Sequence, residues 1–207
     1  QRQMCIRDRH GIVGAQVPIG AGIAFANKYK KNGNVSFTYF GEGAANQGQV
    51  YETFNMASLW NLPVVFVIEN NQYAMGTSIV RASSTEEMFA RGLAFNIPGK
   101  AVNGMNVLEV AKEAGDAADH CRSGKGPFIL EMKTYRYRGH SMSDPAKYRT
   151  REEVQKIREE KDPIDSLRSL LIKKHGVSEK EFKDKDSEIK AIITDASDFA
   201  LNSPEPD

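Results

Sequence analysis

The sequence is poor in cysteine and has no long hydrophobic run. Its 207 residues include two cysteines, Cys5 and Cys121, which do not form a CxxC pair. A disulfide framework or a structural zinc site is therefore not expected, and a reducing compartment is the natural interpretation. No segment approaches the roughly 20 apolar residues that span a bilayer, so we expect no membrane partner.

A marked charge of one sign is lacking as well. The 28 Lys and Arg residues and 27 Asp and Glu residues leave a formal charge of +1, which gives no argument for a nucleic-acid partner. Hydrophobic residues make up 40% and charged residues 27% of the chain, as in ordinary globular domains. The length is sufficient for one α/β domain with its own core.

Two apolar runs flank a helical pattern. Residues 35–40 are β-branched and aromatic, Val50, Phe54 and Ala57 recur at helical spacing, and residues 64–68 form a second apolar run. This order of strand, helix and strand is typical of a parallel βαβ unit. We therefore predict an α/β fold, with a parallel sheet, helices on both of its faces and a helical C-terminal arm.

Further elements follow from local signals. Helices are expected over about 16–30 and 107–122, and a buried strand over 127–134. Residues 83–87 resemble an N-cap with an acidic first turn and predict a helix that runs to about Arg91.

Polar residues follow both central strands. Glu42 comes after the first strand, and Asn70 and Asn71 come after the second. Because parallel strands end on the same edge of a sheet, where ligands bind, these oxygens can converge on Mg²⁺, which phosphate oxygens often complete. The next helix is expected to begin near Ala44, and its free N–H groups favour an anion. The pattern thus predicts a metal site and a diphosphate site at the carboxyl ends of these two strands, around Glu42 and residues 70–71. We call this region the corner.

A dinucleotide site is the main alternative at this point. Residues 41–46 come close to the G-x-G-x-x-G pattern of NAD-binding folds. Two features argue against it: Asn46 stands at the third glycine position, and Glu42 would face a pyrophosphate without an intervening cation. The residues alone leave thiamine diphosphate, NAD and a plain structural turn open.

Three segments carry a resemblance to a known family. They are GEGAANQGQ, ENNQYAMGTS and YRYRGHSMSDPAKYRTREE. The sequence from about His10 to its end resembles the alpha subunits of pyruvate dehydrogenase, which have a thiamine-diphosphate-binding fold. Glu42 stands where this family usually has Asp, so its extra methylene must be absorbed by a small shift.

The resemblance implies roles for residues of the corner. Glu42, the amide of Asn71 and the backbone carbonyl of Tyr73 would hold Mg²⁺, and the backbones of Gly43 and Ala44 would contact the diphosphate of thiamine diphosphate. Asn70 is expected to brace the loop rather than to bind metal.

The resemblance also assigns more distant residues. Gly11 and Val13 would contact the aminopyrimidine of the cofactor through backbone groups. Arg136 could neutralise phosphate charge, and His140 could donate to the diphosphate or to substrate, as a catalytic residue. Ser141 and Ser78 match serines that are phosphorylated in mitochondrial members.

The resemblance divides the chain into three parts. Residues 1–9 form a leader to which we assign no function, either non-native or a transit-peptide fragment. Residues 10–150 form a thiamine-diphosphate-binding domain, incomplete at its N-terminus because family members have well over a hundred further residues. Residues 151–207, which are highly charged, form a helical region. We expect this fragment to be inactive in isolation.

The implied reaction is oxidative decarboxylation of pyruvate with transfer of the acetyl group to a lipoyl arm. The implied partners are a beta subunit, in an assembly of two alpha and two beta chains, and the lipoyl domain of the acetyltransferase component. The compartment would be cytoplasmic in a bacterium, which we favour, or the mitochondrial matrix in a eukaryote. The alternatives are the alpha subunits of acetoin or branched-chain 2-oxoacid dehydrogenase and, from another class, a non-catalytic nucleotide-like binding module.

Overall fold

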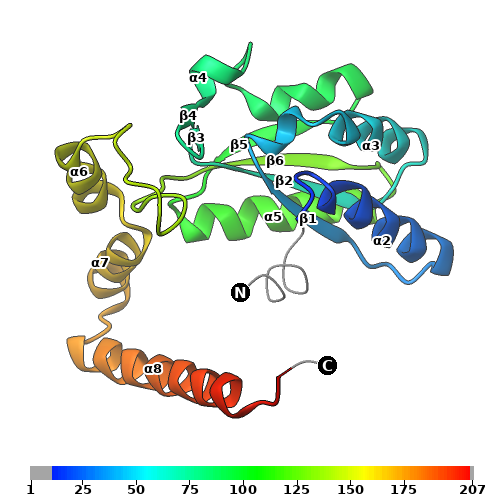
Figure 1. Cartoon of the computed structure of the whole chain (residues 1–207). Helices are drawn as coiled ribbons and strands as arrows, with labels where there is room; N and C mark the ends of the chain where they lie inside the picture. Colours follow the sequence, from blue (N-terminus) through cyan, green and yellow to red (C-terminus); the bar gives the residue numbers. More distant parts are fainter. Residues whose placement is uncertain (1–10, 206–207) are drawn as a thin grey trace. The chain divides into compact units, whose positions relative to one another are not determined.

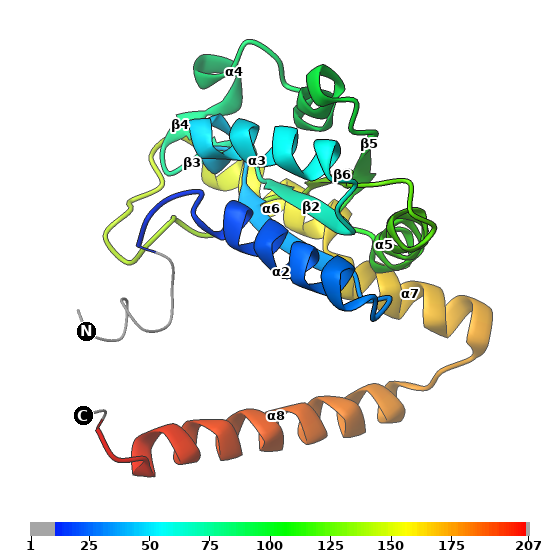
Figure 2. The same ribbon diagram turned by 90° about the vertical axis from the view of Figure 1, so that its right-hand side faces the viewer.

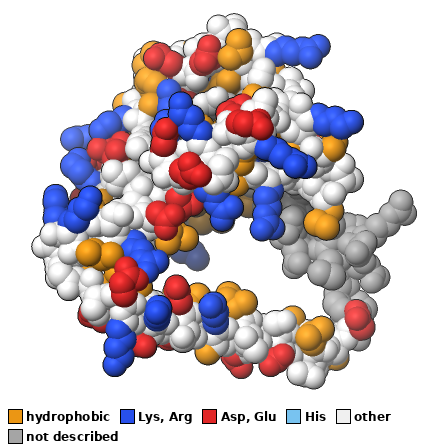
Figure 3. Space-filling model, turned by 90° about the vertical axis from the view of Figure 1, so that its left-hand side faces the viewer, with side chains coloured by type: hydrophobic (Ala, Val, Ile, Leu, Met, Phe, Trp, Pro, Cys, Tyr) orange, Lys and Arg blue, Asp and Glu red, His pale blue; other side chains and the backbone are white. Residues whose placement is uncertain are grey.

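The computed structural model describes residues 11–205. The leader, with Cys5 and His10, lies outside the described residues. The chain divides into two compact units, the first ending at Asp162 and the second beginning at Pro163. Lys and Arg side chains are mixed with Asp and Glu over the face shown in Figure 3. Within the described range, the helices are too short or too polar to cross a membrane.

The first unit is built on a parallel sheet of four strands (Figure 1). In spatial order these are β1 (Ser36–Gly41), β2 (Val64–Asn70), β6 (Phe128–Lys133) and β5 (Gly99–Asn103). β1 and β2 pair from Ser36 opposite Val64 to Gly41 opposite Glu69. The two strands therefore end side by side, as the predicted βαβ unit requires.

Helices cover both faces of this sheet (Figure 1). One face carries α2 (Gln16–Lys30), α3 (Gly48–Leu59) and the 3₁₀ helix η2 (Met88–Phe95). The other face carries α5 (Val107–Arg122). Alternate residues of β2 belong to opposite cores, which explains its uninterrupted apolar sequence. The predicted α/β fold with helices on both faces is confirmed.

Two local predictions differ from the structure. The helix expected near Ala44 begins at Gly48, after a separate 3₁₀ turn, η1 (Ala44–Asn46), because Gln47 is extended at φ −72° and ψ 137°. The helix expected from residue 83 to Arg91 is wrong: a short helix, α4 (Ile79–Ala82), precedes this stretch, and η2 follows it.

The charged C-terminal region is helical, as predicted. Its first helix, α6 (Arg151–Lys161), belongs to the first unit. The second unit contains α7 (Pro163–His175) and the long α8 (Glu179–Asn202, Figure 2). Ser178 and Glu181 form a capping box that starts α8. α7 and α8 have no buried residue, so both are solvated along their length within this unit.

Candidate functional site

The carboxyl ends of β1 and β2 bring Glu42 and Asn71 together. Glu42 follows β1 and is 3% exposed. Its Oε2 accepts a hydrogen bond from the backbone N–H of Asn71, with a distance of 3.3 Å between nitrogen and oxygen. The carboxylate therefore lies under the start of the loop that follows β2, at the corner predicted from the sequence.

Asn70 braces this loop. Its Nδ2 donates to Glu131 Oε1 at 2.7 Å, and its Oδ1 accepts from the N–H of Gln72 at 2.9 Å. Glu131, fully buried in β6, also accepts the N–H of Phe89 through Oε2 at 3.1 Å. The Asn70 side chain thus ties the loop to the sheet, and Asn71 is left at the corner beside Glu42.

The loop continues as a small hairpin of β3 (Tyr73–Ala74) and β4 (Thr77–Ser78). Gln72 and Met75 have φ angles of 71° and 54°, a left-handed conformation that is uncommon for residues other than glycine. Such backbone strain persists only where the surroundings impose it, and it clusters at functional sites.

Close packing joins this hairpin to the turn after β1. A Cβ atom added to Gly43 would lie 2.5 Å from the Cβ of Ala74, closer than carbon atoms can approach. The amide Oδ1 of Asn71 accepts from the N–H of Tyr73 at 3.3 Å. Glycine is therefore required at position 43 for the two loops to meet around the corner.

The residues present fit a divalent cation. Glu42 is buried, yet it belongs to none of the ion pairs among the described residues. A buried carboxylate without a countercharge is costly, and a bound cation would remove that cost. The described residues contain no cluster of three His, Cys, Asp or Glu side chains. Mg²⁺ commonly takes one or two carboxylates and completes its shell with water and phosphate oxygens.

Arg136 occupies the carbonyl group assigned to the metal. Its Nη2 donates to the carbonyl oxygen of Tyr73 at 3.0 Å, and its Nη1 donates to that of Met75 at 3.3 Å. A carbonyl oxygen has two lone pairs, so this bond leaves one acceptor direction of Tyr73 available. The guanidinium reaches the corner from the chain segment after β6.

The loop that carries His140 is organised by Asp144. The Asp144 carboxylate accepts the N–H of His140 at 2.7 Å, the N–H of Ala146 at 2.9 Å and the hydroxyl of Tyr148 at 2.8 Å. These hydrogen bonds lower the pKa of the Asp144 carboxyl. His140 is exposed, and the Oγ atom of its neighbour Ser141 lies 3.0 Å from that of Ser143.

The remaining predicted residues lie in other segments. Gly11 and Val13 are exposed before α2, and the carbonyl of Val13 accepts from Nε2 of Gln49 at 2.7 Å. Ala44 begins η1 beside Gly43. Ser78 ends β4 and is partly exposed. The structure thus gathers Glu42, Gly43, Asn71, Tyr73 and Arg136 through direct contacts. Ser78 is paired with Tyr73 across the small hairpin, whereas no hydrogen bond joins Gly11 or Val13 to the corner residues among the described residues.

Sequence reasoning missed two residues near the corner. Glu131 fastens Asn70, and the signal for it is a single acid inside the apolar strand FILEMK. Arg149 is 9% exposed, and its guanidinium carbon lies 5.8, 5.2 and 5.1 Å from the ring centres of Tyr73, Tyr135 and Tyr148. A recurrence of tyrosine and arginine between residues 135 and 149 is its signal.

A parallel α/β domain with an acid and an amide at adjacent strand ends is consistent with a thiamine-diphosphate-binding fold. The family model "Dehydrogenase E1 component" matches residues 1–207. The chain belongs to this family.

Curated relatives agree with this assignment. The chain is 60% identical over 198 residues to the pyruvate dehydrogenase E1 component subunit alpha of Rhizobium meliloti, covering 96% of this chain and 57% of that protein. It is 58% identical over 197 residues to the Zymomonas mobilis subunit of the same name, covering 95% and 55%. The testis-specific mitochondrial form of Rattus norvegicus is 53% identical over 198 residues, covering 95% and 50%. The chain thus spans about half the length of the curated relatives that it matches.

Proposed function

We propose that the full-length protein is the alpha subunit of a pyruvate dehydrogenase, which decarboxylates pyruvate oxidatively and passes the acetyl group to a lipoyl arm. In this proposal the chain supplies the magnesium and diphosphate side of the active site. The observation that carries it is the buried Glu42 carboxylate, which has no ion-pair partner among the described residues and lies against Asn71. The names of the relatives support pyruvate as substrate.

The corner residues would hold Mg²⁺ and the diphosphate of thiamine diphosphate. Glu42, Asn71 and the carbonyl of Tyr73 would be the metal ligands. Gly43 and Ala44 would offer backbone groups to the diphosphate, because no side chain at position 43 bars its approach. When bound, the thiazolium ring of the cofactor supplies the electron sink that decarboxylation of a 2-oxo acid requires.

Residues of the later loop would orient charge around the diphosphate. Arg136 would bring a positive charge to the corner while it holds the carbonyl groups of Tyr73 and Met75. His140, whose backbone N–H is held by the Asp144 carboxylate, would donate a hydrogen bond to the diphosphate or to substrate at the mouth of the site. Gly11 and Val13 would meet the aminopyrimidine through backbone groups.

The proposal includes partners and a compartment. A beta subunit would complete the active site in an assembly of two alpha and two beta chains, and the lipoyl domain of an acetyltransferase component would receive the acetyl group. The compartment would be the cytoplasm of a bacterium, or the mitochondrial matrix in a eukaryote.

Phosphorylation of Ser141 or Ser78 would regulate the site. A phosphoryl group adds about two negative charges at neutral pH. On Ser141 this charge would lie next to the residue that we assign to the diphosphate, His140, and would repel the diphosphate.

The test is the 2-oxo acid dependence of the assembled full-length enzyme. We expect reduction of its lipoyl acceptor with pyruvate, and a much lower kcat/KM with branched-chain 2-oxo acids and with acetoin. If the enzyme instead prefers a branched-chain 2-oxo acid or acetoin, that compound is its substrate in place of pyruvate. Absence of turnover with every substrate, in an assembly shown to be intact, would support a non-catalytic binding module instead.

A further inference from the structure

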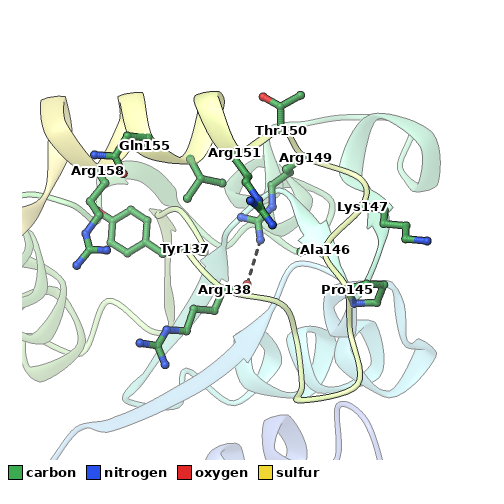
Figure 4. A pocket seen from close by; sticks show the side chains of 11 residues that line it. Tyr137, Arg138, Pro145, Ala146, Lys147, Arg149, Thr150, Arg151, Gln155 and Arg158 are labelled. Carbon is green, nitrogen blue, oxygen red and sulfur yellow. Dashed lines mark hydrogen bonds between the residues drawn. The ribbon is translucent and has the colours of Figure 1, made fainter.

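A pocket lined by several cationic side chains lies outside the corner. It has a volume of about 670 Å³ and is formed by residues 137–151 together with one face of α6 (Figure 4). None of the residues assigned to Mg²⁺ or thiamine diphosphate lines it. Five lining residues are cationic, and none is acidic; the cations are Arg138, Lys147, Arg149, Arg151 and Arg158.

Arg149 forms the base of this pocket. It is 9% exposed, and its Nη2 donates to the carbonyl of Arg138 at 3.0 Å. Its Nε and Nη1 are buried and have no hydrogen-bond partner among the described residues. Figure 4 shows the Arg149 and Arg151 side chains directed into the pocket. Buried N–H donors on a charged group are costly when they remain unpaired. The tyrosine rings beside the guanidinium offset part of this cost, and an anionic acceptor in the pocket would offset more of it.

Three nearby acids are engaged in other hydrogen bonds. Asp144 accepts three hydrogen bonds within its own loop. Glu153 accepts the hydroxyl of Tyr135 at 2.7 Å, and Glu159 accepts Nε2 of Gln155 at 2.6 Å. No Asp or Glu side chain is among the described residues that line the pocket with the five cations.

The N-terminus of α6 adds to the positive potential. Thr150 caps this helix by accepting the N–H of Glu153 at 3.1 Å, and both Thr150 and Arg151 line the pocket. The first N–H groups of a helix carry partial positive charge and favour anions. The backbone N–H groups and the cationic side chains thus both present positive charge to the pocket.

We propose that this pocket binds a phosphate group, either inorganic phosphate or the phosphate of a small ester. A dianion matches several guanidinium groups better than a carboxylate does, and guanidinium pairs phosphate oxygens through two parallel hydrogen bonds. A volume of about 670 Å³ is within the range of small-molecule sites, so an ester has room. Arg149 binds the phosphate at the base, and Arg151 and Arg138 contact it nearer the rim.

Occupancy of the pocket stabilises the neighbouring loop. The Arg149 guanidinium packs on the rings of Tyr73 and Tyr148, and the Tyr148 hydroxyl bonds to the Asp144 carboxylate that holds His140. An anion that fixes Arg149 therefore also restrains the loop between residues 137 and 150.

The test is calorimetric titration of the assembled full-length protein with sodium phosphate, glycerol phosphate and sodium acetate. Each titration is made with and without saturating thiamine diphosphate and Mg²⁺, which separates this pocket from the corner. The variants are Arg149→Gln and Arg151→Gln; the matched control is Arg122→Gln, which removes an exposed arginine outside the pocket. Arg151 is exposed, so its variant keeps the test valid if Arg149→Gln does not fold.

We expect saturable binding of phosphate to the wild-type protein and to Arg122→Gln, both with and without the cofactor, and weaker binding of acetate. The Arg149 and Arg151 variants should bind phosphate about tenfold or more weakly. Tighter binding of glycerol phosphate would identify an ester as the ligand, and equal binding would identify free phosphate. Absence of phosphate binding, or binding unchanged in the folded Arg151→Gln protein, would overturn the proposal.

Discussion

Replacement of Glu131 should loosen the loop at the corner although this residue lies in the sheet. Its two carboxylate oxygens accept one hydrogen bond each, from Nδ2 of Asn70 and from the N–H of Phe89. In Glu131→Gln one of these acceptors becomes an NH₂ group, which leaves a buried donor facing another donor. An unsatisfied buried group costs about 1–3 kcal/mol, and the cost falls on the attachment of residues 70–73 and of η2.

Hydrogen exchange measures this effect at the affected amides. A loss of about 2 kcal/mol from the local opening free energy raises the exchange rate roughly 30-fold, because each 1.4 kcal/mol is a factor of about ten. We expect faster exchange at Phe89, which loses its acceptor, or at Gln72, whose acceptor Asn70 loses its own anchor.

The control is Glu69→Gln, an exposed acid on the neighbouring strand β2. Its effect should stay within about 0.5 kcal/mol, as for surface substitutions in general. Unchanged exchange at both Phe89 and Gln72 in Glu131→Gln would refute the view that Glu131 fastens the loop.

Three further predictions follow from single residues. Gly43→Ala should destabilise the protein by about 1–3 kcal/mol in denaturant unfolding, because the added Cβ overlaps that of Ala74. The control Gly41→Ala, whose added Cβ meets no atom within 4 Å, should be near neutral. Equal losses of stability in the two variants would contradict the packing argument. Hydrogen bonds lower the pKa of Asp144, so its stabilisation of the loop is present at neutral pH and is lost as the pH falls through that lowered pKa. Limited proteolysis should show this acid transition in the wild type and not in Asp144→Asn. Burial raises the pKa of the Cys121 thiol to about 12, so mass spectrometry should find Cys121 unalkylated at pH 8 until the protein is unfolded, and rapid labelling in the native state would disprove its burial.

The sequence predicts the regular elements well because their patterns are local. Residues 16–30 and 107–122 form α2 and α5 with the predicted bounds, and the apolar run from Val64 reads as a buried parallel strand. The helix predicted after residue 83 fails for a physical reason. The N–H of Phe89 bonds to Glu131 in the sheet, 42 positions away, and this tertiary contact overrides the local capping signal.

The corner could be predicted only in part. The order of strands places Glu42 near Asn71, since both follow neighbouring parallel strands. The burial of Arg149 and the bond from Arg136 to the Tyr73 carbonyl depend on how a later loop folds back. No periodic pattern in the sequence encodes such long-range contacts, so they can be identified only from the three-dimensional structure.

The most direct test of the account is calorimetric titration of thiamine diphosphate into the assembled full-length protein, with and without Mg²⁺. We expect Mg²⁺-dependent binding that is lost in Asn71→Ala, which removes an oxygen ligand, and in Glu42→Gln, which removes the negative charge that neutralises the cation. Binding of equal strength without Mg²⁺, or unchanged in both variants, would contradict the assignment of Glu42 and Asn71 to the metal.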